Sequence, residues 1–113
     1  MRLDGFSEPV PDILLLRRRE RGYRDRHPTP EDVFLLVQVA DTSLRYDRAV
    51  KVPLYARHGV PEVWIVNIRG QAVEVYRDPS PGGYRDARTL KRGETLQVLA
   101  LPDVTLRVDE ILG

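Results

Sequence analysis

Three side chains in the first half of the chain could act together on a phosphodiester. Asp12 opens the apolar stretch Ile13-Leu14-Leu15-Leu16, Gln38 lies near the end of a second apolar stretch, and Lys51 follows in a predicted helix. An acid at one strand end, a polar oxygen at the end of the next strand and a nearby lysine would converge on one spot. This arrangement is typical of a metal-dependent phosphodiester site, where the cation polarises the phosphate and activates water.

The strand that must position Gln38 is the apolar run from Val33 to Val39, VFLLVQV. A run of strand formers without polar alternation is typical of a strand covered on both faces, so it is predicted at the centre of the sheet. Strict alternation assigns its residues to two faces, Val33, Leu35, Val37 and Val39 on one and Phe34, Leu36 and Gln38 on the other. Gln38 therefore stands where the pattern of its face predicts an apolar residue.

The element that must position Lys51 is a predicted helix from Leu44 to His58. The Asp-Thr-Ser sequence before it supplies N-cap side chains, and Gly59 is suited to the position after its last turn. Pro53 is expected to kink or weaken this helix, because the proline ring removes one hydrogen-bond donor and crowds the preceding turn.

Two interpretations of Lys51 stay open. Asp47 lies one helical turn before it, so the pair could be a surface ion pair worth about 0.2–0.5 kcal/mol. Alternatively, Lys51 is a site lysine. Since only Lys51 and Lys91 among the 18 basic residues are lysine, a lysine at this position carries some information.

The second half of the chain is predicted to be largely antiparallel. A buried strand over Val63 to Ile68 and an alternating strand over Ala72 to Arg77 flank a short turn and indicate a β-hairpin. The DPSPGG sequence from Asp78 to Gly83 is predicted to be a loop. Short antiparallel strands are expected from Tyr84 onward, and a helical turn over Asp109 to Leu112 closes the chain.

Length and composition restrict the class of protein. A chain of 113 residues is expected to form one domain, residues 1–113. The absence of cysteine excludes disulfides, thiolate nucleophiles and cysteine-based zinc sites, and a net charge of +1 favours no particular partner. No signal core and no apolar run of roughly 20 residues is present, so we expect a soluble, cytoplasmic protein without a membrane association.

Local charge is less even than the total. The segment from Arg17 to His27 combines six arginines with two acids and Tyr23. It can be a solvated loop whose charges partly pair, or a patch that contacts DNA phosphates with Tyr23 available for stacking. The arginines that would contact DNA are Arg17, Arg18, Arg19, Arg21, Arg24 and Arg26.

The order of these segments resembles the Uma-two family, a group of restriction-endonuclease-like proteins in the PD-(D/E)xK nuclease superfamily. The resemblance covers about residues 8 to 112, and its most specific part is Tyr55 to Val66, YARHGVPEVWIV, preceded by Ser43, Asp47 and Lys51 at family-like spacing. It implies an α+β fold: a restriction-endonuclease-like mixed β-sheet core with one central helix and a C-terminal antiparallel hairpin or meander.

The resemblance also implies a set of site residues. The family pattern has Asp at Asp12, Glu at Gln38 and Lys at Lys51, and these three are the candidate catalytic residues. Magnesium would be held by Asp12, the residue at Gln38 and the backbone carbonyl of Val39. Because an amide removes one negative charge from the site, Gln38 is expected to weaken magnesium binding and hydrolysis. Asp41 is a less favourable substitute, since three extended residues span roughly 10 Å.

The start of the chain is a second departure from the family. Only eleven residues precede Asp12, whereas the family usually carries an additional helix and strands there, so an N-terminally shortened core is expected. Apolar surface exposed in this way needs a cover, which predicts a homodimer burying about 1,200 Å² or more. Two functions stay open: a magnesium-dependent DNA phosphodiesterase, or a catalytically inactive homodimeric scaffold or protein-interaction module of the same fold.

Overall fold

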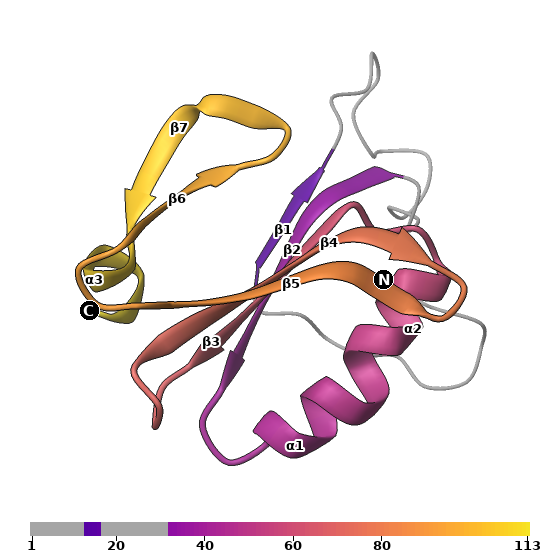
Figure 1. The fold of residues 1–113 in the computed structure, drawn as a ribbon, viewed down its shortest axis with the longest axis horizontal. Helices are drawn as coiled ribbons and strands as arrows, with labels where there is room; N and C mark the ends of the chain where they lie inside the picture. Colours follow the sequence, from indigo (N-terminus) through magenta and orange to yellow (C-terminus); the bar gives the residue numbers. More distant parts are fainter. Residues whose placement is uncertain (1–12, 17–31) are drawn as a thin grey trace, which may run out of the picture.

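A mixed five-stranded sheet forms the centre of the computed structural model, which describes residues 13–16 and 32–113 (Figure 1). Its strands are β1 (Ile13–Leu16), β2 (Val33–Ala40), β3 (Glu62–Asn67), β4 (Ala72–Ser80) and β5 (Gly83–Lys91), in the spatial order β1-β2-β3-β4-β5. β2 and β3 are parallel and the other neighbours are antiparallel. A second sheet pairs β6 (Thr95–Val98) with β7 (Leu101–Arg107), and α3 (Val108–Leu112) follows. The predicted α+β, restriction-endonuclease-like fold class is confirmed.

The middle strand is β3, so the prediction that the Val33 to Val39 strand is central was wrong by one position. The reason lies in the predicted loop from Asp78 to Gly83. β4 continues through Ser80, and β5 begins at Gly83 as a nine-residue strand, which extends the sheet by one long partner. Asp78 takes a positive φ of 61° inside β4, so the strand accommodates the bend rather than ending there.

The side chains of β2 do not alternate over its whole length. Leu15 pairs with Leu35 and Leu16 pairs with Val33, which leaves Phe34 as an extra residue in a β-bulge. Val33 consequently packs in the same core as Leu36, and Phe34 packs on the opposite face. The predicted faces hold from Leu35 onward and are inverted for the first two residues.

The predicted helix is present in three consecutive segments: α1 (Leu44–Tyr46), η2 (Asp47–Lys51) with π-helical geometry, and α2 (Val52–Arg57). In the π turn, the Val52 N–H donates to the Asp47 carbonyl five residues earlier. Pro53 lies in the first turn of α2, where its missing N–H costs little. The wider turn thus accommodates the proline without ending the helix. Gly59 follows with a φ of 73°, as expected for the glycine predicted directly after the last turn of the helix.

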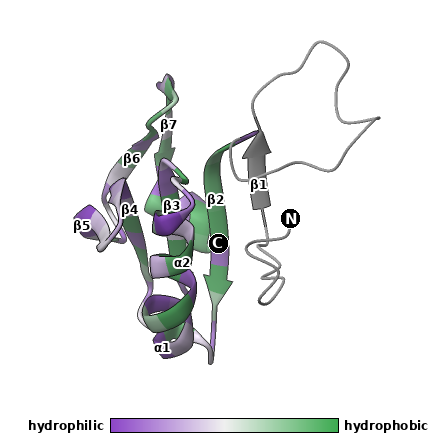
Figure 2. Ribbon diagram, turned by 90° about the vertical axis from the view of Figure 1, so that its right-hand side faces the viewer, coloured by the Kyte–Doolittle hydropathy of each residue, from purple (hydrophilic) through white to green (hydrophobic). Residues whose placement is uncertain are grey.

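Apolar side chains fill both faces of the sheet. Val63 and Ile65 of β3 face the helix with Leu36, while Trp64 and Val66 face β6, β7 and α3. Figure 1 shows the helix on one side of the sheet and the small hairpin with α3 on the other, and Figure 2 shows that β2 is hydrophobic along most of its length. Among the described elements, no helix has the length and apolar character needed to cross a membrane.

Candidate active site

Gln38 is a buried amide near the carboxyl end of β2, on the face that packs against the helix. It pairs with Ile65 of the parallel strand β3 and lies between Leu36 and Ala40 on that face. Asp12 lies outside the described residues. Ile13, which follows it in the chain, pairs with Val37, the neighbour of Gln38. The antiparallel register therefore joins the start of β1 to the end of β2 that carries Gln38.

Val39 and Asp41, which lie one and three residues after Gln38, are both exposed. Val39 is exposed, so its side chain belongs to the opposite face of β2. Asp41, the substitute acid considered from the sequence, is exposed and forms an ion pair with Arg69 at 3.1 Å. An exposed pair of this kind contributes little stability, about 0.2–1 kcal/mol. Asp41 is thus a surface group beyond the end of β2.

Lys51 is the terminal member of a polar row along the helix. Ser43 Oγ donates to Asp47 Oδ2 at 2.9 Å, and Lys51 Nζ lies 3.4 Å from Asp47 Oδ1. The ammonium group also lies 5.9 Å from the centre of the Tyr46 ring. The Asp47–Lys51 pair foreseen as a surface pair is therefore present but inside the protein, because Asp47 is fully buried and the Lys51 side chain is 19% exposed.

A second buried acid, Glu74 of β4, lies in the same cross-sheet row as Gln38. Gln38 pairs with Ile65, and Ile65 pairs with Glu74, so the two polar residues are two strands apart on the helix-covered face. Arg48 Nε donates a hydrogen bond to Glu74 Oε1 at 2.8 Å, and Arg48 Nη2 donates a second one to Glu74 Oε2. Tyr76 donates its hydroxyl to Oε1 at 2.6 Å.

These contacts decide the ionisation of Glu74. Burial alone would raise the pKa of the Glu74 carboxyl, but the hydrogen bonds from Arg48 and Tyr76 and the charge of Arg48 outweigh it and lower that pKa. The same carboxylate raises the pKa of the Arg48 guanidinium. Burial, followed by the hydrogen bond to Glu74, raises the pKa of Tyr76. The Glu74 carboxylate and the Arg48 guanidinium thus form an ion pair between the helix and β4, and Tyr76 supports it as a neutral hydrogen-bond donor.

The sequence did not single out Glu74 as a buried group. In the alternating strand from Ala72 to Arg77, Glu74 occupies the face opposite Val73 and Val75, which is the pattern of a solvent-facing position. The helix covers that face instead, and the bidentate contact with Arg48 makes the burial tolerable. Two features of the sequence could have indicated this burial: Arg48 lies in the predicted helix, and Glu74 and Tyr76 lie on one face of the same predicted strand. If the helix packs on that face, the arginine can reach the glutamate.

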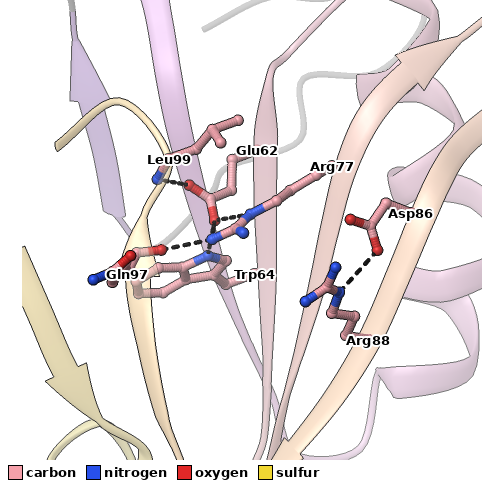
Figure 3. A network of polar contacts seen from close by, with 7 residues as sticks. All are labelled: Glu62, Trp64, Arg77, Asp86, Arg88, Gln97 and Leu99. Carbon is pink, nitrogen blue, oxygen red and sulfur yellow. Dashed lines mark hydrogen bonds and ion pairs between the residues drawn. The ribbon is translucent and has the colours of Figure 1, made fainter. Parts of the chain in front are cut away.

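The other face of the sheet holds Glu62, a fully buried carboxylate with a structural role (Figure 3). Its Oε2 accepts hydrogen bonds from Trp64 Nε1 at 2.9 Å and from Arg77 Nε at 2.8 Å, and its Oε1 accepts the Leu99 backbone N–H at 2.8 Å. Arg77 also donates to the Gln97 carbonyl at 2.6 Å. This network joins β3 and β4 to the hairpin of β6 and β7.

A cavity of about 280 Å³ lies beside this network, on the face opposite Gln38. Its lining residues are Val75, Arg77, Arg88, Leu90, Thr95, Leu96, Gln97 and Thr105. Both of its cations are already paired, Arg77 with Glu62 and Arg88 with Asp86. The cavity therefore has no spare charge with which to bind an ion.

The described side chains do not by themselves form a magnesium site. In the parts of the chain that the structure describes, no three acidic, histidine or cysteine side chains come together. Asp47 is paired with Lys51 and Glu74 with Arg48, while the Gln38 amide and the Val39 carbonyl are uncharged oxygen donors. Magnesium favours charged oxygens and gives up its water reluctantly. A cation at the Gln38 amide and the Val39 carbonyl would need negative charge from another residue, which is the role that the family resemblance gives to Asp12.

The comparisons with known proteins identify one family. The family model Uma2, described as "Putative restriction endonuclease", matches residues 1–109 of the chain. No curated protein matches the chain.

Proposed function

Because the chain belongs to the Uma2 family, we propose that it is a restriction-endonuclease-like domain in which an amide at the metal position weakens magnesium-dependent hydrolysis of DNA. A nuclease-like function holds at the level of the family. Gln38 carries the proposal for this chain, since it is a buried amide at the strand position where the family pattern has glutamate. When magnesium binds such a site, it polarises the phosphate and lowers the pKa of the attacking water.

The weakening follows from the charge of the donors. A glutamine oxygen has nearly the shape of a carboxylate oxygen, but the exchange removes one negative charge beside the cation. Coulomb attraction between two unit charges 4 Å apart is worth about 4 kcal/mol at an effective dielectric of 20. Even a fraction of this energy lowers magnesium affinity more than tenfold. We therefore expect this chain to hydrolyse DNA more slowly than a family member that carries glutamate at this position.

Substrate contact is assigned to the arginine-rich segment of residues 17–26. It lies outside the described residues, so it stays a prediction from its six arginines. Each phosphate that such a side chain neutralises should steepen the salt dependence of binding to double-stranded DNA by about 0.9 in the slope of log K against log salt.

The experiment is Gln38→Glu, assayed by thermal unfolding in chelator and in magnesium. Two nearby carboxylates repel at a partly buried strand end, so the variant should melt below wild type in chelator. Magnesium bound only by the folded form should reverse that loss and give a larger gain than in wild type. Cleavage of DNA that appears in the variant and disappears in Gln38→Glu/Lys51→Ala would place Lys51 in the reaction.

The matched control is Gln97→Glu, which adds the same charge at an exposed amide on β6. It should show no magnesium-dependent gain. If Gln38→Glu and wild type respond identically to magnesium, Gln38 is not at a metal position and the nuclease proposal fails.

One observation favours the second candidate, a catalytically inactive homodimeric scaffold of the same fold. The Lys51 ammonium is held by the buried Asp47 carboxylate and by the Tyr46 ring, and reaching a phosphate would require it to leave both. Wild type that forms dimers but shows no cleavage at any magnesium concentration, together with an unresponsive Gln38→Glu variant, would select this candidate.

A further inference from the structure

The hairpin of β6 and β7 concentrates the exposed apolar side chains of the described chain. Leu99, Leu101 and Val104 are 51%, 42% and 39% exposed and lie within six residues of one another. β7 pairs with β6 at Leu101 and again from Thr105 to Arg107, and a register irregularity leaves residues 102–104 without a partner in β6. In the described ranges no strand pairs with the other edge of β7. Figure 1 shows β7 on the side of this hairpin that is turned away from β5. An open, partly apolar edge is a template for pairing with another strand.

We propose that two copies of this chain associate by antiparallel pairing of β7 with β7, centred on Thr105. In this register Asp103 faces Arg107 of the second copy, and Val104 faces Leu106 of the second copy. The twofold axis repeats both contacts. The inference names the interface of the homodimeric candidate above, and it does not depend on nuclease activity.

The register follows from the sequence of β7. Pro102 has no N–H and cannot donate to a neighbouring strand, so pairing is confined to Asp103–Arg107. These five residues are symmetric about Thr105. Centring on Val104 would place Pro102 opposite Leu106, and centring on Leu106 would run the pairing into α3. Only the Thr105 centre uses the whole segment.

Charge complementarity supports a second copy as the occupant. Within the described part of the chain Asp103 has no ion-pair partner, and Arg107 has only an exposed contact with Glu110 at 3.1 Å. Charged side chains on an edge strand usually prevent pairing, but here opposite signs lie two residues on either side of Thr105. Self-pairing therefore joins each acid to a base, whereas a neutral or like-charged partner strand would leave both unpaired.

The apolar side chains fit the same register. Leu106 is half-buried and packs with Leu96 and Val108 on one face of the hairpin, and Val104, two residues before it, is 39% exposed. Pairing would place Val104 beside Leu106 of the second copy and extend that core across the interface. The exposed Leu99 and Leu101 at the tip would then lie near the start of α3 of the second copy.

The first experiment measures mass by light scattering and sedimentation across concentration. Wild type should reach about twice 13.0 kDa, and Val104→Lys should weaken the dimer at least tenfold. The control is Val50→Lys, which changes a valine of similar exposure, 44%, on the helix and should leave the mass unchanged. A monomeric wild type at millimolar concentration, or equal dissociation of both variants, would overturn the inference and leave the magnesium experiment unaffected.

The second experiment tests the register by charge reversal. Asp103→Arg and Arg107→Asp should each weaken the dimer at least tenfold, because each places like charges opposite one another. The double variant should recover the wild-type dissociation constant to within about threefold. Aspartate is a favourable N-cap for α3, so Arg107→Asp should stay folded, which circular dichroism checks. Failure of the double variant to recover would reject the Thr105-centred pairing.

Discussion

Glu74 shows how its contacts with Arg48 and Tyr76 decide the charge of a buried group. The carboxylate is buried beneath the helix, yet Arg48 and Tyr76 lower its pKa, so it stays ionised in a place that would otherwise favour the neutral form. A depressed folded-state pKa contributes stability above the unfolded value and loses it as the pH falls through the folded value. In wild type this loss therefore occurs in acid, below the usual pKa of 4.5.

Removing the arginine should reverse that dependence. In Arg48→Met the burial of Glu74 is opposed only by Tyr76, so the pKa rises and protonation becomes favourable to folding. We expect a loss of about 1.5–3 kcal/mol at pH 7, the value of a charged hydrogen bond, and a smaller loss near pH 5. Urea unfolding between pH 4 and 7 measures this. Arg88→Met, which removes an exposed pair with Asp86, should change stability by less than about 1 kcal/mol without the reversal.

At the scale of elements, the sequence predicts segments well and their surroundings less well. The apolar runs located β2 and β3, the turn residues located the hairpin of β3 and β4, and Gly59 located the end of the helix. Each of these depends on local chemistry.

The π turn, the bulge at Phe34 and the burial of Glu74 depend on what packs against the segment. Pro53 predicted a disturbance of the helix, but only packing of both flanking segments on the sheet makes a wider turn preferable to a break. The same limit applies to the candidate site, where residue types were visible and the pairing of Lys51 with Asp47 was left open.

The hairpin of β6 and β7 should depend on one buried carboxylate. Glu62 links Trp64, Arg77 and the Leu99 N–H, so Glu62→Ala leaves three donors without their acceptor and should cost about 3–5 kcal/mol. The hairpin amides should lose hydrogen-exchange protection, and the emission of Trp64, the single tryptophan, should change.

Glu110→Gln is the control for this loss, because Glu110 is an exposed acid in α3 and its removal should leave the stability and the hairpin protection close to those of wild type. If the hairpin amides of Glu62→Ala keep the hydrogen-exchange protection that they have in wild type, Glu62 does not hold the hairpin of β6 and β7 on the sheet.

For the molecule as a whole, two partly buried phenols predict alkaline sensitivity. Burial, with a smaller contribution from Tyr55, raises the pKa of Tyr84, and burial and Glu74 raise the pKa of Tyr76. A raised folded-state pKa gives stability that is complete below the unfolded value of 10.0 and is lost as the pH rises toward the folded value. Unfolding temperature should therefore fall steeply above pH 10.

Tyr84→Phe separates this effect from packing. The variant loses the 2.7 Å hydrogen bond to the Val60 carbonyl and about 1 kcal/mol at neutral pH, but it should lose less than wild type between pH 10 and 12. Thermal unfolding across this range measures both. Tyr46→Phe, at an exposed tyrosine, should follow the wild-type curve. If the unfolding temperatures of Tyr84→Phe and wild type fall in parallel between pH 10 and 12, ionisation of Tyr84 is not a cause of the alkaline loss of stability.

The parallel pairing of β2 with β3 has a consequence for synthesis on the ribosome. β2 ends at Ala40, but the edge that faces β3 has no partner until Asn67 has been made. At about 5–20 residues per second, this delay is on the order of one to five seconds. During it an apolar strand can pair only with β1, whereas β3, β4 and β5 follow one another through short turns. The strand that carries Gln38 is thus the segment of the nascent chain that most needs a chaperone.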